Sequence, residues 1–207
     1  HKRVKEYNER RLLNALPVKT CVTAVAHREW EDNADYTATA PVLTIDDRDV
    51  TKDGEAAMKR GTAYHRAMEL VDFENPDLDG LRRDCENFDL LDERVILTAA
   101  NVMKELTRDC AYAARERYFI ANLPAGVVYG EDKTGNVLVQ GVIDLLIVHS
   151  DNTVTIVDYK TGNPSSLRND GYRKQLELYS AAVERCTPYK VRSAVLYSFA
   201  AGELIKP

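Results

Sequence analysis

The sequence predicts an α/β domain with a mixed central sheet flanked by helices. Two apolar stretches, Gly141 to His149 and Thr153 to Lys160, are separated by a short polar turn, which is typical of a β-hairpin. Segments with helical periodicity lie before and after this hairpin, at 61–70 and 171–184, and Ala194 to Phe199 supplies a closing strand. The resulting order of helix, three-stranded meander, helix and strand indicates an α/β sandwich.

The remaining elements follow from local patterns. The first strand of the meander is expected to begin at Tyr118 and Phe119, and the second to run from Val137 to Val148. Between Asp77 and Asp109 the apolar residues recur at helical spacing. We interpret this segment as a helical insertion that packs on the core rather than forming a partner groove.

Length and composition are those of a single domain. The 207 residues contain 44% hydrophobic residues, enough for one sizeable core. We expect one domain over 1–207, with an N-terminal arm and loop at 1–55 and a core at 56–207. Residues 31–55 are polar and rich in structure-breaking residues, so they are interpreted as a loop that could hold one short strand and some disorder.

The hairpin carries three charged residues in otherwise apolar strands. If its turn is centred on Asp151, Asp144 lies opposite Asp158, and two opposed carboxylates about 5 Å apart repel each other unless a divalent cation lies between them. Lys160 follows Asp158 by two positions and therefore shares its face. A buried ion pair without a metal is the alternative, although three charges are costly to bury in such apolar strands.

Two helical segments hold further candidates. His65 and Glu69 are four residues apart in GTAYHRAMEL and share one helix face, but taken alone this pattern favours a packed core histidine at His65. Gln175 and Tyr179 share a face of the helix in GYRKQLELYSAAVE, with apolar residues available for packing. Each pattern is weak by itself.

In combination these motifs resemble a known family. The order GTxxH, GxID, DYKT and QLxLY, preceded by PVKTCVTAV, is similar to the RecB-type nuclease family of the PD-(D/E)XK superfamily. It resembles in particular the C-terminal nuclease domain of AddA-type helicase-nucleases, from about Pro17 to the end of the chain. The resemblance implies a restriction-endonuclease-like core carrying the helical insertion at about 77–109.

The resemblance also implies a metal site. Asp144 and Asp158 would ligate the metal, the carbonyl of Tyr159 would contribute, and His65 would be an additional ligand. Mg²⁺ or Mn²⁺, as one or two ions, fits carboxylates with one imidazole better than Zn²⁺ does.

The other site residues receive roles by the same resemblance. Lys160 would position or activate the attacking water, and Gln175 and Tyr179 would hold Lys160 or the nucleic-acid backbone. Glu116 matches a further acid of the family or is a solvated carboxylate at a helix end. Glu69 either supports His65 or is an exposed acid.

The resemblance finally implies a larger context. The chain would be the C-terminal fragment of a longer ATP-dependent helicase-nuclease that acts as an exonuclease in double-strand-break repair and recombination. Its substrate would be single-stranded DNA delivered by a helicase domain of the same full-length chain, together with an AddB-like subunit. The fragment contains no GxxxxGK[ST] motif and hence no ATP site of that kind.

Charge leaves two alternatives open. A formal net charge of −5 is unusual for a protein that binds DNA by itself. Basic residues gather in an N-terminal arm and beside the 171–184 helix, and either group could be a solvated face: Lys2, Arg3, Lys5, Arg10, Arg11, Arg168, Arg173 and Lys174. The alternatives are a catalytically silent nuclease-like module that binds DNA or a partner, and a hydrolase of another phosphoester.

Cysteine usage and hydropathy set the remaining expectations. The four cysteines are widely separated and lack the spacing of a zinc ribbon or an iron-sulfur cluster, so we expect no cluster. Reduced cysteines, the absence of a signal-peptide pattern and the absence of a long apolar run favour a cytoplasmic protein without membrane contact.

Overall fold

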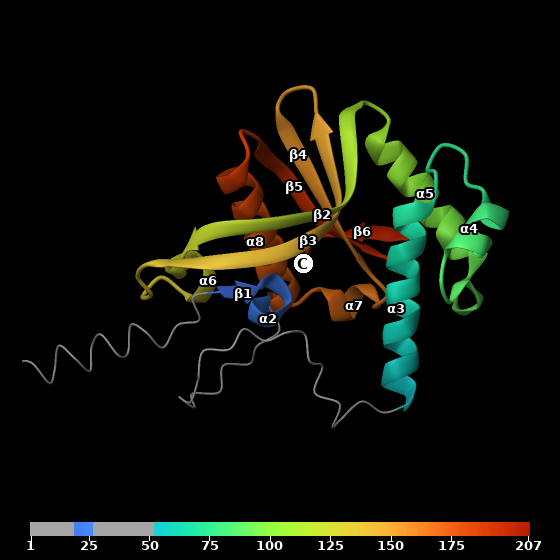
Figure 1. The fold of residues 1–207 in the computed structure, drawn as a ribbon, viewed down its shortest axis with the longest axis horizontal. Helices are drawn as coiled ribbons and strands as arrows, with labels where there is room; N and C mark the ends of the chain where they lie inside the picture. Colours follow the sequence, from blue (N-terminus) through green and yellow to red (C-terminus); the bar gives the residue numbers. More distant parts are fainter. Residues whose placement is uncertain (1–18, 27–51) are drawn as a thin grey trace, which may run out of the picture.

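One mixed sheet forms the centre of the molecule (Figure 1). The computed structural model describes residues 19–26 and 52–207, and its six strands within these ranges run in the order β1-β3-β4-β5-β6, with β2 paired to β3. Pairing is parallel for β1 with β3 and for β4 with β5, and antiparallel elsewhere. The predicted α/β fold with a mixed sheet flanked by helices is confirmed.

The elements of the described ranges have the following bounds. The strands are β1 (Lys19–Cys21), β2 (Cys110–Pro124), β3 (Asn136–His149), β4 (Thr153–Lys160), β5 (Lys190–Ser198) and β6 (Glu203–Ile205). The helices are α2 (Val22–Ala26), α3 (Lys52–Leu70), α4 (Leu78–Asp84), the short 3-10 helix η1 (Phe88–Leu90), α5 (Glu93–Thr107), α6 (Ala125–Tyr129), α7 (Pro164–Leu167) and α8 (Asp170–Cys186).

The β3–β4 hairpin has the predicted register. Leu145 pairs with Val157 and Val148 with Val154, as expected for a turn centred on Asp151, and the ladder ends one residue before Asp144 and Asp158. Asn152 closes the turn in the left-handed region at φ 62°, a conformation that asparagine tolerates better than most residues. The turn prediction is therefore confirmed.

The sheet opens into a fork beside the two aspartates. On one edge β3 pairs with β1 through Leu138–Gln140 and with β4 through Leu145–Val148, so within the described residues 141–144 have no strand partner on that edge. Strand β4 instead continues along β5 as far as Lys160 opposite Ser198. The separation of β3 from β4 places Asp144 and Asp158 on its two arms.

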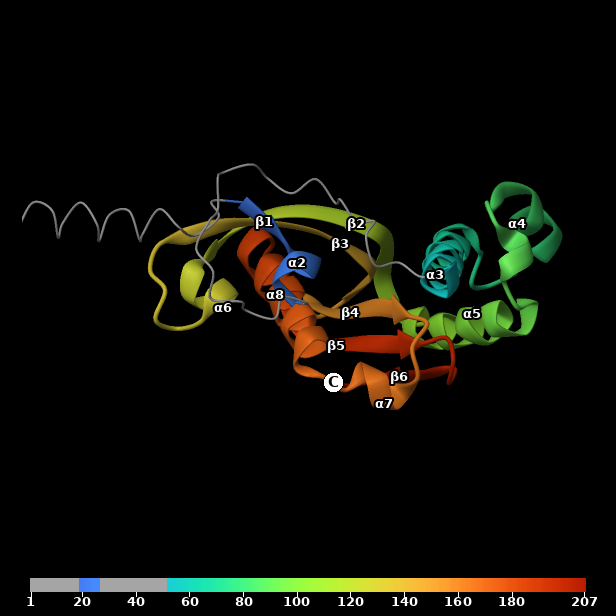
Figure 2. The same cartoon turned by 90° about the horizontal axis from the view of Figure 1, so that it is seen from below.

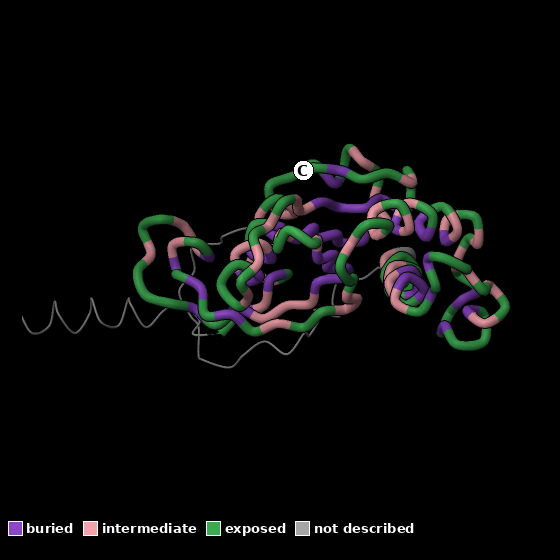
Figure 3. Tube along the Cα trace, turned by 90° about the horizontal axis from the view of Figure 1, so that it is seen from above, coloured by how far each residue is buried: buried purple, intermediate pink, exposed green. Residues whose placement is uncertain are grey.

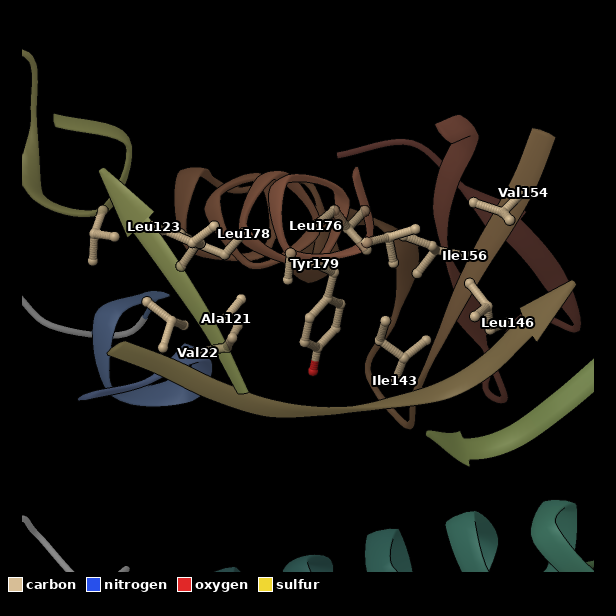
Figure 4. Close-up of a cluster of buried hydrophobic side chains, with 14 of the residues drawn as sticks. Val22, Ala121, Leu123, Ile143, Leu146, Val154, Ile156, Leu176, Leu178 and Tyr179 are labelled. Carbon is tan, nitrogen blue, oxygen red and sulfur yellow. The ribbon is translucent and has the colours of Figure 1, made fainter. Parts of the chain in front are cut away.

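Apolar side chains cover both faces of the central strands. Residues 143–148 of β3 and 154–159 of β4 are buried without interruption, as the near-continuous apolar runs predicted. One cluster lies under α8, where Leu176, Leu178 and Tyr179 point towards the strands (Figure 4). Figure 3 shows buried segments in the middle of the sheet, while buried and exposed residues alternate towards the far end of the β2–β3 ribbon.

The second cluster joins the predicted helical insertion to the sheet. Helices α3, α4 and α5 lie together at one end of the molecule, whereas α8 occupies the concave side of the curved β2–β3 ribbon (Figure 2). Met68 of α3, with Ile96 and Met103 of α5, is fully buried against Leu145 and Ile147 of β3. The insertion thus packs on the core, as expected.

Three boundaries differ from the predictions. Strand β2 begins at Cys110 rather than at Tyr118, because pairing with the whole length of β3 outweighs the weak strand preference of the Ala- and charge-rich segment 110–117. Helix α3 begins at Lys52, so 52–55 are helical and not loop. A sixth strand, β6, adds to β5 beyond the predicted closing strand.

The basic N-terminal arm lies outside the described residues, and its members are Lys2, Arg3, Lys5, Arg10 and Arg11. No helix in the described ranges combines the length and apolar character needed to cross a membrane.

The absence of a side chain at Gly141 is predicted to be essential for packing. A Cβ at Gly141 would lie 2.8 Å from the Phe119 ring, which itself packs edge-on against Tyr179. Gly141→Ala should lower the free energy of unfolding by about 1–3 kcal/mol because a packed core resists added volume. Urea denaturation of the variant measures this.

Gly61 supplies the matched control. It lies within helix α3, and a Cβ there would meet nothing within 4 Å. Gly61→Ala should raise the free energy of unfolding by about 0.5–1 kcal/mol through helix propensity. Equal effects of the two substitutions would contradict the packing role of Gly141.

Candidate metal centre

The fork opens into a cleft of about 530 Å³. Each of the five sequence motifs, from PVKTCVTAV at the start of α2 to QLxLY in α8, contributes to its wall. The lining includes Val22, His65, Tyr118, Gly141, Asp144, Asp158, Lys160, Gln175 and Tyr179. The folded chain therefore brings together residues that are far apart in the sequence, from Cys21 to Tyr179.

Asp144 is fixed by contacts with two other elements. Its Oδ2 accepts a hydrogen bond of 2.6 Å from the Tyr159 backbone N–H, which replaces a ladder bond at the fork. Its Oδ1 lies 3.3 Å from Nδ1 of His65 on α3. A residue in a strand directs its N–H and C=O to the same side, so the Tyr159 carbonyl also faces the fork.

Asp158 is held from the opposite face by α8. Its Oδ2 forms an ion pair with Lys160 Nζ, and its Oδ1 accepts a hydrogen bond of 2.9 Å from Gln175 Nε2. Gln175 Nε2 also donates to the Tyr179 hydroxyl at 3.0 Å. In the structure Gln175 holds Asp158, the ion-pair partner of Lys160, and is itself linked to Tyr179, whereas their contact with the nucleic-acid backbone stays a prediction.

Glu116 lies in strand β2, so its alternative interpretation as a helix-end carboxylate is wrong. It falls between the pairs Arg115–Leu145 and Arg117–Ile143, opposite Asp144, and has a left-handed backbone with φ 46°. One ligand atom from each of His65, Glu116 and Asp144 lies within 4.8 Å of the other two. A strained backbone at such a position is typical of functional sites.

Glu69 lies outside this group. Its carboxylate pairs with Arg66 on the exposed side of α3, and no contact with His65 is found among the described residues. Of its two interpretations, the exposed acid is the one that agrees with the structure.

The carboxylates at the fork are electrostatically strained. Burial, reinforced by Asp144, raises the pKa of Glu116 to about 7. Burial also raises the pKa of Asp158 to about 6, although Lys160 opposes the shift. For His65, burial lowers the pKa but the hydrogen bond and charge of Asp144 outweigh it, so the net shift is upward.

These observations fit a divalent cation. Glu116, Asp144 and Asp158 gather at the fork with one lysine. An added positive charge would reduce their mutual repulsion and offset the cost of burying them. Carboxylate oxygens with one imidazole nitrogen form a donor set that suits Mg²⁺ or Mn²⁺. The buried Gln175 Oε1 has no hydrogen-bond partner among the described residues, so the cleft also retains an unsatisfied acceptor.

Arg115 is a positioning residue that the motifs did not reveal. Its guanidinium donates hydrogen bonds of 2.9 and 2.6 Å to the carbonyls of Glu69 and Val71 at the end of α3, and it stacks over Phe73. It thereby ties the helix that carries His65 to the strand that carries Glu116. The sequence gave no sign of this contact, because Arg115 lies before the predicted start of the strand and its hydrogen bonds depend on where α3 ends.

Fold and cleft together define an α/β domain with a group of potential metal ligands at a fork of its sheet, and comparison with known proteins specifies the family. The profile of the PD-(D/E)XK nuclease superfamily matches residues 40–206. This chain belongs to that superfamily.

Curated relatives identify the branch. The chain is 32% identical over 93% of its length to an ATP-dependent helicase/nuclease subunit of the AddA type from Moorella thermoacetica. It is 28% identical over 75% of its length to the corresponding protein of Ruminiclostridium cellulolyticum, and 31% identical over 74% to that of Bacillus velezensis. The resemblance to AddA-type proteins is thus confirmed, and the chain spans 14–15% of the length of these relatives.

The raised pKa of Glu116 predicts that the free energy of unfolding depends on pH. In EDTA, Glu116→Gln should stabilise the chain by about 1 kcal/mol at pH 8, a value reduced for screening of a half-buried group. The Glu116 carboxyl has a pKa of about 7 in the folded protein and about 4.5 in the unfolded chain. The wild-type protein therefore loses stability as the pH rises from about 4.5 to 7, whereas the glutamine variant does not titrate. Thermal unfolding between pH 4.5 and 8 tests this.

Glu131→Gln, at an exposed loop position, is the control and should change nothing. Added Mn²⁺ should reverse the order, stabilising the wild type more than Glu116→Gln. A Glu116→Gln effect that is constant over the whole pH range would contradict the prediction.

Proposed function

We propose that this chain is the divalent-metal-dependent nuclease domain of an ATP-dependent helicase-nuclease and hydrolyses phosphodiester bonds of DNA. The observation that carries the proposal is the convergence of His65, Glu116, Asp144, Asp158 and Lys160 at one fork of the sheet. An intact set of this kind argues against a catalytically silent module. The superfamily match supports the same reaction class.

We assign the metal ligands as His65, Glu116 and Asp144, with Asp158 and the Tyr159 carbonyl completing the set. A bound Mg²⁺ or Mn²⁺ supplies an acidified water and neutralises charge on the phosphate. The Tyr159 N–H fixes one oxygen of Asp144, which orients the other towards His65. Gln175 fixes the other aspartate by donating to Oδ1 of Asp158, which leaves Oδ2 beside Lys160.

Lys160 is assigned as the residue that orients the attacking water and the phosphate. Burial lowers the pKa of its ammonium, but Asp158 outweighs this, and the net shift is upward. A charged ammonium donates hydrogen bonds and has no lone pair to accept a proton. Lys160 therefore acts through hydrogen bonding and charge rather than as the general base.

The wider role rests on the relatives. Their names describe one subunit of an ATP-dependent helicase/nuclease, and this chain corresponds to a small part of such a subunit. We infer that the rest of the protein carries the helicase, delivers single strands to the cleft and works with an AddB-like subunit. Exonucleolytic degradation in double-strand-break repair and recombination is the corresponding biological role.

Two substitutions should separate metal binding from hydrolysis. Lys160→Met should lower the rate of DNA cleavage about 10²–10⁴-fold while Mn²⁺ still binds, because the ammonium is not a ligand. Asp144→Asn should abolish both. Cleavage of labelled single- and double-stranded DNA with Mg²⁺ or Mn²⁺, beside titration calorimetry with Mn²⁺, measures the two properties.

Lys104→Met is the matched control, because Lys104 pairs with Glu74 at the surface of the helical insertion and should be dispensable for cleavage. Cleavage that survives in both cleft variants would indicate a contaminating nuclease and contradict the proposal. A wild type that binds Mn²⁺ and DNA without cleaving would indicate the silent module instead.

A further inference from the structure

The convex face of the β2–β3 ribbon carries large apolar side chains in the open. Ala121 and Leu123 of β2 point towards α8 (Figure 4), so strand alternation turns Tyr118 and Ile120 to the opposite face. Tyr118 is 76% exposed and Ile120 60% exposed. Within the described ranges β2 has no strand at its outer edge, and exposed apolar side chains on such a strand are an aggregation liability, which indicates that the surface has a use.

This apolar face adjoins the metal centre directly. Tyr118 follows Glu116 by two positions on β2 and pairs with Val142, which precedes Asp144 by two positions on β3. Residues two apart in a strand are separated by about 6.7 Å along the backbone, so Tyr118 is a near neighbour of the carboxylate positions in the sheet. Tyr118, Ile120 and Val142 line the same cleft as Asp144 and Lys160.

The charge of the cleft points to what this face binds. Apart from His65, its charged lining consists of Asp144 and Asp158 against Lys160, so phosphate attraction supplies little affinity here. A nucleotide whose phosphate lies at the metal centre has its base within reach of Tyr118. Stacking of a base on an aromatic ring provides affinity without any positive charge.

We propose that Tyr118 and Ile120 form a platform on which the nucleobase next to the scissile phosphate stacks, so that the cleft accepts unpaired DNA. This inference rests on the proposed nuclease function. A base within a duplex has its faces covered by its neighbours and cannot lie flat on the platform. The platform therefore selects single strands independently of any helicase.

Binding of oligonucleotides with and without bases tests the platform. The 207-residue chain is mixed with labelled dT12 or with a 12-mer that carries abasic sites in its centre, in Ca²⁺ to prevent cleavage, and anisotropy gives each Kd. The wild type should bind dT12 about 5- to 100-fold more tightly. Tyr118→Ala should lose most of this preference, and Tyr118→Phe should retain it.

Tyr112→Ala is the matched control, because Tyr112 is 49% exposed on the same strand but does not line the cleft. The dependence of Kd on salt should be the same in Tyr118→Ala as in the wild type, since no charge is removed. A wild type that binds both oligonucleotides equally or not at all, or a Tyr118→Ala variant that keeps the preference, would overturn the platform.

Cleavage assays keep this inference separate from the proposed function. If the wild type cleaves DNA and Tyr118→Ala cleaves single and double strands with the wild-type ratio, the platform fails and the nuclease assignment stands. If base-dependent binding that requires Tyr118 is found without cleavage by the wild type, the nuclease assignment fails, and Tyr118 and Ile120 stand as a base-binding surface but not as one beside a scissile phosphate.

Discussion

The hydrogen bond from the Tyr159 N–H to the Asp144 carboxylate is the contact on which the site depends. Below it, β3 and β4 form an ordinary antiparallel ladder, and above it they separate. A strand that leaves its partner exposes backbone groups that must find another acceptor or donor. Here the Asp144 carboxylate accepts the hydrogen bond of the freed Tyr159 N–H, and this contact also orients Asp144. Backbone pairing and site geometry are therefore one feature of this fold.

The fork also explains why charged groups tolerate burial here. Each of the two aspartates is bound from a different layer: Asp144 by His65 on the α3 side, and Asp158 by Gln175 on the α8 side. The contacts of Asp158 do not offset its burial fully, because its pKa remains raised, and burial also raises the pKa of Glu116 beside Asp144. The remaining imbalance is negative, and a divalent cation is the simplest group that removes it. The buried carboxylates thus lower the stability of the metal-free protein, and the same negative charge would favour binding of a cation.

Much of this arrangement could be predicted from the sequence, and the failures share one cause. The period-two and period-3.6 patterns gave the hairpin register and helix α8 because those features are local. The start of β2, the position of Glu116 in that strand and the partner of Gln175 depend on tertiary pairing that local propensity does not contain. Glu116 was recognisable only as a candidate acid, since its positive φ and its approach to His65 arise from the packing of α3 on the sheet.

The apolar platform compensates for the weak attraction between an acidic cleft and DNA. A chain with a net charge of −5 gains little from long-range attraction to DNA, and the carboxylates at the fork repel phosphate unless a cation offsets their charge. Affinity must then come from contacts that ignore charge, and exposed Tyr118 and Ile120 beside the carboxylates offer them. In the helicase-nuclease that we propose, weak electrostatic binding has a further advantage, because a strand that is not held by its phosphates can be advanced past the cleft. In that protein the same contacts would serve both recognition of unpaired bases and repeated release of the strand.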